Sequence, residues 1–303
     1  HSPSSSFFLR RSAAPAGGFE PPRRFPDLSV FKTVPFSQTW VILHIKSEFI
    51  APITTAEDLA KIASKSGEFV LTSDLDLGDS LNKEYSISGD FDGNGHSITY
   101  GGSKSLFFTV TGSVRHLYVN ANVKGSDSYV GGIAMANSGV IEDCEVSGTV
   151  SNPVANASQN SYVSGVAGRN AGGTISHCHV ICDAIDAPTA CGITWQGENG
   201  TVRDNVFNGQ FGQSAKQMYM VCNGITNSTI EGNYYIANPA NSTAELVSGV
   251  TVGKTDELVQ QAKNEADIYP VYAASIRKKY SNVFDVNLKT STEVALVNLS
   301  ATS

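Results

Sequence analysis

The chain of 303 residues is long enough for one large domain or two smaller ones, and its 41% apolar residues can supply a substantial core. Only 16% of the residues are charged while 28 are glycine, a balance that suits short strands joined by tight turns. The net charge of −7 provides no basic patch for nucleic acid, and no apolar run approaches the roughly 20 residues of a membrane-spanning helix, so we expect neither role.

The first part of the chain lacks the pattern of a folded element. It is rich in proline, including Pro21-Pro22, and shows no sustained helical or strand period. We therefore interpret residues 1–50 as a leader outside the fold, either disordered or added during cloning. The opening His1-Ser2-Pro3 has no features of a secretory signal, so any export signal is expected to be encoded elsewhere.

A short capping helix is predicted for residues 51–67. Thr54 and Glu57 have the spacing of a capping box ahead of apolar Leu59, and Gly67 provides the expected stop. We expect this helix to cover the first end of the structure that follows.

Two strand-like segments alternate through the next part of the chain, residues 68–245. The first segment begins at Val114, Ile141, Ile175, Val202 and Ile230. The second segment reaches a glycine at Gly132, Gly165, Gly192 and Gly224. The copies recur about every 27 residues, a period too short for paired-helix repeats, and one longer spacing is explained by an inserted polar loop at 151–160.

The backbone is expected to bend within the first segment. Its apolar residues fall at positions 1, 4 and 6, whereas a straight strand would place them at every second position. The third position is held by residues that tolerate a left-handed corner: His116, Asp143, His177, Asp204 and Gly232. We therefore predict an all-β, right-handed parallel β-helix, or solenoid, with short capping helices at each end, in which Ile141 contacts Ile175.

The repeats resemble the GLUG-motif family over roughly residues 54–240. The motifs that carry the resemblance are Gly89-Asp-Phe-Asp-Gly-Asn-Gly-His-Ser-Ile98, Val130-Gly-Gly-Ile133, Asn137-Ser-Gly-Val-Ile-Glu-Asp-Cys144 and Gly172-Gly-Thr-Ile-Ser-His-Cys178. Asn205 and Asn233 depart from the family pattern, because they replace an inward apolar residue. Members include adhesin-like bacterial surface proteins and the regions ahead of the catalytic domain in IgA-cleaving metallopeptidases. The resemblance implies a secreted or cell-surface location and no chemistry.

The remaining residues, 246–303, are expected to form a helical cap and a tail. Leu258, Val259 and Ala262 have helical spacing, and Pro270 interrupts the pattern. These helices are expected to cover the last end of the repeat stack, because an open end exposes unpaired strand edges.

The cysteines and the corner residues can be interpreted in two ways. Cys144 and Cys178 occupy the same inward position in adjacent repeats, so they are close enough for a disulfide, although buried free thiols are favoured. The corner His and Asp residues could suggest a metal site, and Asp92-Gly-Asn94 resembles the start of a calcium loop. The need for a left-handed corner explains the His and Asp residues without a metal. The segment at Asp92 lacks the final glutamate that a calcium loop requires. No metal and no cofactor are therefore predicted.

Outward aromatic residues are the candidate ligand-binding residues: Tyr118, Tyr129, Tyr162, Trp195 and Tyr234. Three of them on one exposed face would favour a binding surface. The hypothesis is a non-catalytic surface module for adhesion, for binding a glycan or a cell-surface protein, or for spacing another domain, and no catalytic residue is predicted. The alternative is a polysaccharide lyase or hydrolase, which would need several carboxylates converging on one face.

Overall fold

The computed structural model describes residues 50–152 and 161–280. The chain divides into two units, His1–Lys46 and Ser47–Ser303, and the first lies wholly outside the described residues. Apart from Ile50, the predicted leader lies outside them, as do most of the inserted loop and the tail beyond Tyr280. The described strands run from Ile50 to Val252, so the strand region extends past the predicted limits of 68–245 at both ends.

Among the described residues, the strands form three sheets of 14, 6 and 4 strands, and every pairing of named strands is parallel. The path of the first sheet is β1 (Ile50–Ile53), β2 (Glu68–Leu71), β5 (Asp90–Asp92), β8 (Ser113–Lys124), β11 (Val140–Ser151), β14 (Thr174–Val180), β19 (Val206–Phe207), β23 (Asn233–Tyr235) and β24 (Val250–Val252). Its branches are β3 (Leu75–Asp76), β6 (Ser97–Gly102), β15 (Ala184–Asp186), β18 (Thr201–Arg203) and β22 (Thr229–Glu231). The second sheet contains β4 (Ser86–Ile87), β7 (Phe107–Val110), β10 (Ala134–Asn137), β13 (Ala167–Ala171), β17 (Thr194–Glu198) and β21 (Cys222–Thr226). The third contains β9 (Tyr129–Gly131), β12 (Tyr162–Ser164), β16 (Thr189–Cys191) and β20 (Gln217–Tyr219).

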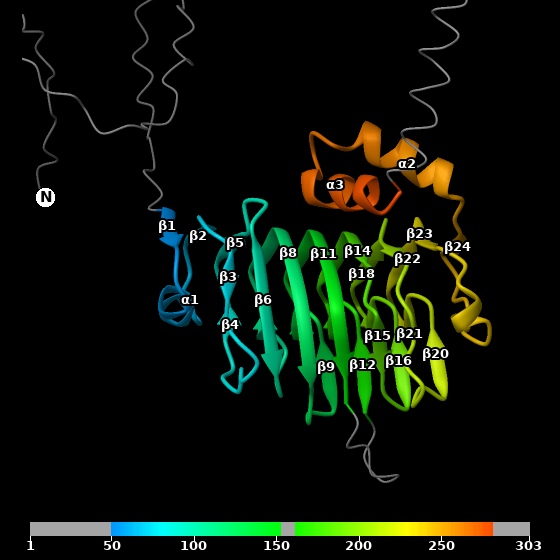
Figure 1. Ribbon diagram of the computed structural model, residues 1–303, viewed down its shortest axis with the longest axis horizontal. Helices are drawn as coiled ribbons and strands as arrows, with labels where there is room; N and C mark the ends of the chain where they lie inside the picture. The colour runs from blue at the N-terminus through cyan, green and yellow to red at the C-terminus, as the bar shows by residue number, and fades with distance from the viewer. Residues whose placement is uncertain (1–49, 153–160, 281–303) are drawn as a thin grey trace, which may run out of the picture. The chain divides into compact units, whose positions relative to one another are not determined.

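Residues one repeat apart are neighbours on adjacent strands. Ile141 of β11 pairs with Ile175 of β14 on one side and with Val114 of β8 on the other, which confirms the predicted contact. Figure 1 shows these strands side by side in chain order. The all-β class predicted from the sequence is therefore confirmed.

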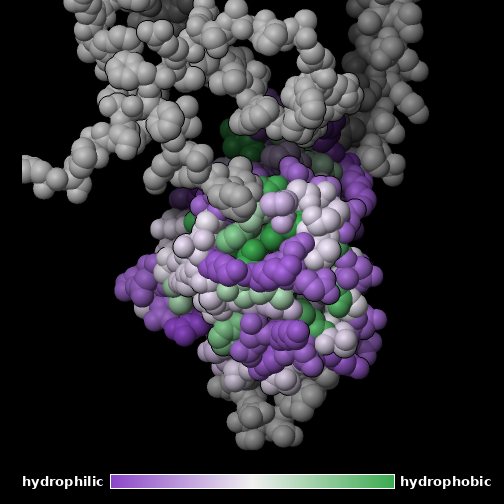
Figure 2. Space-filling model, turned by 90° about the vertical axis from the view of Figure 1, so that its left-hand side faces the viewer, coloured by the Kyte–Doolittle hydropathy of each residue, from purple (hydrophilic) through white to green (hydrophobic). Residues whose placement is uncertain are grey.

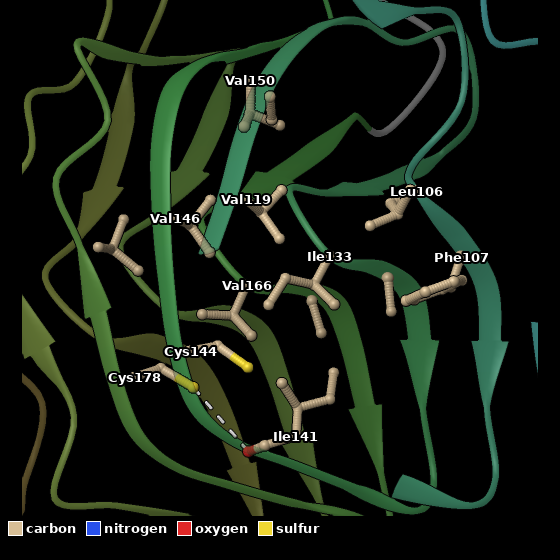
Figure 3. Packing of buried hydrophobic residues seen from close by; sticks show 14 of the residues in the cluster. Leu106, Phe107, Val119, Ile133, Ile141, Cys144, Val146, Val150, Val166 and Cys178 are labelled. Carbon is tan, nitrogen blue, oxygen red and sulfur yellow. Dashed lines mark hydrogen bonds between the residues drawn. The ribbon is translucent and has the colours of Figure 1, made fainter. Parts of the chain in front are cut away.

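The apolar core lies between the sheets. Figure 3 shows Leu106, Ile133, Val146 and Val166 pointing toward one another, and each of these side chains is fully buried. All five cysteines are free and buried, as favoured from the sequence. Burial raises the pKa of Cys182 to about 12, so this thiol stays protonated and packs as a small apolar group.

The predicted corners are confirmed. The residues at the third position of the first segment all have positive φ: His116 (52°), Asp143 (52°), His177 (48°), Asp204 (56°) and Gly232 (63°). This bend lets apolar positions on both sides of the corner face the same core.

The first helix differs in detail from the prediction. Helix α1 spans Ala56–Ile62 and follows strand β1, which the sequence analysis missed. The cap is Thr55, whose hydroxyl accepts a hydrogen bond from the Asp58 N–H at 3.2 Å, so the predicted Thr54–Glu57 box is wrong by one residue. The helix also ends before Gly67, because Ser64 already adopts a left-handed φ of 60°. Figure 2 looks at this end, where mainly hydrophilic residues surround a smaller apolar area.

The C-terminal helices have the predicted type but not the predicted position. Helices α2 (Thr255–Asn264) and α3 (Pro270–Lys279) lie across the outer face of the first sheet, with α3 against β8, β11 and β14 (Figure 1). Their apolar residues pack there on Val206 of β19. The prediction that they cover the last edge is wrong, since β24 forms that edge and Val252 remains 49% exposed. A short 3-10 helix, η1 (Pro239–Asn241), precedes β24, and no described helix has the length and apolarity needed to cross a membrane.

Candidate functional site

Four aromatic rings form a continuous stack across the second and third sheets, which we call the aromatic ladder: Tyr129, Tyr162, Trp195 and Tyr219. Tyr129 and Tyr162 begin the paired strands β9 and β12, and their ring centroids lie 5.3 Å apart at an interplanar angle of 23°. Trp195 comes from β17 and stacks on Tyr162 at 4.0 Å and 15°. Tyr219 of β20 meets Trp195 edge to face at 6.3 Å. All four side chains are half-buried.

A glycine makes room for the ladder. Gly168 of β13 lies beside Tyr129, and a Cβ atom at this position would come within 2.9 Å of the Tyr129 Cβ and 2.8 Å of the Val130 nitrogen. Contacts this short require the neighbouring strand to move. The missing side chain therefore allows β13 of the second sheet to lie close to Tyr129 of the third sheet.

The ladder presents ring edges and hydroxyl groups rather than open ring faces. Stacking occupies the faces between Tyr129, Tyr162 and Trp195. Burial, and after it the neighbouring Tyr129, raises the pKa of Tyr162, while burial and Glu245 raise that of Tyr219. These phenols stay neutral at physiological pH. The surface can offer apolar area and hydrogen-bond donors.

The structure brings together three of the five predicted site residues and separates the other two. Tyr118 lies on β8 and lines a hollow of about 420 Å³ with His116 and the first residues of α3. Tyr234 of β23 packs against the cluster formed by α2 and α3. Neither residue belongs to the ladder.

Sequence reasoning missed Tyr219 because it misaligned the fourth copy of the second segment. Thr189 of β16 pairs with Gln217, and Cys191 pairs with Tyr219. Met220 follows β20 directly, as Gly192 follows β16, so Met220 is the residue equivalent to Gly192. The prediction that Gly224 is equivalent to Gly192 is therefore wrong. The recurring glycine was the alignment signal, and it is absent from this copy.

At the corner beside His116, the carboxylates do not form the open pair that the enzyme alternative requires. Asp92 Oδ1 lies 2.9 Å from His116 Nδ1, but Asp143, on the other side of this ring, is completely buried. The Asp143 carboxylate accepts the backbone N–H groups of Val271 and Tyr272 at 3.2 and 2.7 Å. Burial raises the pKa of Asp143 to about 6, against the opposing effect of these hydrogen bonds. Asp143 thus holds the start of α3.

The described ranges contain no group of three or more His, Cys, Asp or Glu side chains placed to hold a metal ion. The predicted corner column therefore does not assemble a metal centre among these residues. His116 is hydrogen-bonded to Asp92, which raises the pKa of this histidine, and His177 is stacked on Tyr269.

Comparison with known proteins identifies no family for this chain. No family model matches the chain, and no curated protein matches it. Among solved structures, it is similar to a crystal structure from Bacteroides ovatus named "a putative immunoglobulin A1 protease", with 18% sequence identity and a TM-score of 0.45. The similarity covers 70% of this chain and 86% of that one. A similarity of this size carries no argument about activity.

Proposed function

We propose that the three sheets are the faces of a right-handed parallel β-helix, a solenoid that serves as a rigid module on the surface of a bacterium. The parallel pairing of residues one repeat apart supports this architecture, and the strong right-handed preference of parallel crossover connections supports its hand. The resemblance to the GLUG-motif family supports a secreted or cell-surface location. Continuous pairing of strands from Ile50 to Val252 gives the stiffness that a spacer requires.

The aromatic ladder is the proposed contact surface, and the partner is a glycan or a cell-surface protein. The observation that carries this proposal is that Tyr129, Tyr162 and Trp195 stack on one another and are each partly exposed, with Tyr219 extending the stack. Aromatic edges with hydroxyl donors combine apolar area with hydrogen bonding and lose little side-chain entropy on binding. The module is proposed to be non-catalytic, because the contact surface is built from aromatic rings rather than from a pair of carboxylates.

Replacing Trp195 with alanine is expected to weaken partner binding at least tenfold, because the central ring of an aromatic contact patch is a typical hot spot. Binding is measured by screening a glycan array and a panel of cell-surface proteins, followed by calorimetric titration of the parent and each variant with each partner found. Any polysaccharide that binds is also tested for depolymerisation.

Two controls separate loss of contact from loss of fold. Trp195→Phe keeps a ring on Tyr162 and should retain most of the affinity. Asn122→Ala, on an exposed position of β8, should bind as the parent does. Equal affinity of Trp195→Ala and the parent would exclude the ladder as the contact surface, and turnover of a polysaccharide would replace the binding proposal with the enzyme alternative.

A further inference from the structure

The helix pair α2–α3 is attached to the first sheet by polar groups as well as by apolar packing. Tyr272 and Ile276 of α3 are buried with Leu258 of α2 against Val206. At the start of α3, Asp143 accepts two backbone N–H groups. At its far end, the Tyr280 hydroxyl lies 2.7 Å from Asn208 Nδ2. The two helices contact each other, so they can leave the sheet as one unit.

Two histidines of strand β14 lie under this helix pair. His179 is completely buried, and its Nδ1 atom lies 2.6 Å from the Ser275 hydroxyl oxygen of α3. Its Nε2 atom is buried with no hydrogen-bond partner among the described residues. His177 is 3% exposed and stacks on Tyr269 at 3.5 Å and 13°. Tyr272 meets the same ring edge to face at 5.7 Å. Protonation of either ring in place would bury a charge.

We propose that the helix pair is an acid-labile strap: it stays docked on the first sheet at neutral pH, and protonation of His177 and His179 releases it. Release would expose the apolar surface around Val206. It would also remove the first residues of α3 from the hollow beside Tyr118. This inference is independent of the ligand of the aromatic ladder, which lies on the other two sheets.

Charged groups face His179 from both α3 and the neighbouring strand β11. His179 faces Ser275 and Lys279 of α3, and it pairs laterally with Glu145 of β11. Burial, with a smaller effect of Lys279, lowers the pKa of His179 to about 3. The pairing with Glu145 does not reverse this direction.

His177 has a more mixed charge environment. Asp204, Arg203 and Glu142 act on it from the sheet, and Glu265 Oε2 lies 3.9 Å from its Nε2 atom. Burial is the largest effect and lowers the pKa of His177, Asp204 and Glu142 act to raise it, and Arg203 acts to lower it. Both histidines therefore favour the neutral, docked form.

The sign of the pH dependence follows from these directions. Both histidines have a lower pKa when docked, so their contribution is present above the ordinary value of 6.5 and is lost as the pH falls. For His179, the shift from 6.5 to about 3 disfavours docking by roughly 30-fold between pH 7.5 and pH 5. Asp143 acts in the opposite direction, because its pKa is raised from 3.8 to about 6 in the docked form. Between pH 7.5 and pH 5, its protonation favours docking by roughly tenfold and so offsets part of the effect of His179. Glu265 also opposes release, because burial raises its pKa. The expected net effect is release on acidification, increased by His177.

Hydrogen exchange of peptides covering residues 255–279 tests the strap, with rates corrected for the intrinsic effect of pH. In the parent, protection at pH 5 should fall at least threefold relative to pH 7.5. Asp143→Asn removes the opposing titration of this carboxyl while keeping an acceptor for α3, so its loss should approach 30-fold. The double variant His177→Phe, His179→Asn keeps a ring on Tyr269 and a polar atom for Ser275, and its protection should rise on acidification.

A second measurement keeps the test valid if a variant folds poorly. In the parent, the ring resonances of His179 should show no protonation of the docked form above about pH 4. Protection that does not change with pH in the parent, or that falls equally in the parent and the double variant, would overturn the proposal. A docked His179 that titrates near 6.5 would also overturn it.

Discussion

Replacing Gly165 with alanine is expected to lower the free energy of unfolding by about 3 kcal/mol, because backbone and side-chain atoms occupy the space that its Cβ would need. The added atom would collide with the carbonyl oxygen of Gly192 on the next strand and lie 2.6 Å from Val180 Cγ1. A Cβ atom at Gly132 or Gly192 would likewise collide with a backbone carbonyl oxygen of the following copy, so each of these copies needs a glycine at this position. Chemical denaturation followed by circular dichroism measures the change.

Gly197→Ala is the matched control. Gly197 is buried like Gly165 and lies in β17, but the nearest atoms to its Cβ would be 3.5 Å away, an ordinary contact. This substitution should change the free energy of unfolding by no more than about 0.5 kcal/mol, since alanine also restricts the unfolded chain. If the two variants were equally stable, close stacking of the strands at Gly165 would be incorrect.

The sequence was sufficient to predict the stacking because its signals are local and repeat. Ile141 and Ile175 carry the same apolar pattern one period apart, and each corner needs a residue that tolerates positive φ. The prediction failed where the local signal was missing. Met220 replaces the glycine of earlier copies, so the fourth copy was misaligned and Tyr219 was overlooked.

The candidate site was only partly predictable, because some of its determinants are distant in the chain. Tyr129 and Tyr162 could be matched through the repeat, and they are indeed paired. Tyr118 has a similar outward position in the sequence, but the start of α3 lies beside it. That position depends on contacts such as Asp143 with the Tyr272 N–H, which join residues far apart in sequence. Helical periodicity predicts that α3 forms, but it does not predict which strands α3 covers.

Asn205→Ala is expected to lower the free energy of unfolding by about 3 kcal/mol, because it leaves buried backbone groups without partners. Asn205 occupies the inward position that Cys178 holds in the preceding repeat, and it is completely buried. Its Oδ1 atom accepts the Cys178 N–H at 2.9 Å, and its Nδ2 group donates to the Ile175 carbonyl at 3.0 Å. Nδ2 also donates to Asn233 Oδ1 at 3.0 Å, so the two amides form a ladder.

The amide ladder explains why polar residues replace apolar ones in these later copies. The left-handed corner at Asp204 interrupts strand pairing, and the amides of Asn205 and Asn233 bond the backbone groups beside it. Thermal denaturation of Asn205→Ala should be compared with Asn122→Ala, because Asn122 is an exposed strand residue of β8. The exposed control should stay within about 0.5 kcal/mol of the parent. Equal stability of Asn205→Leu and the parent would show instead that volume, and not hydrogen bonding, determines this position.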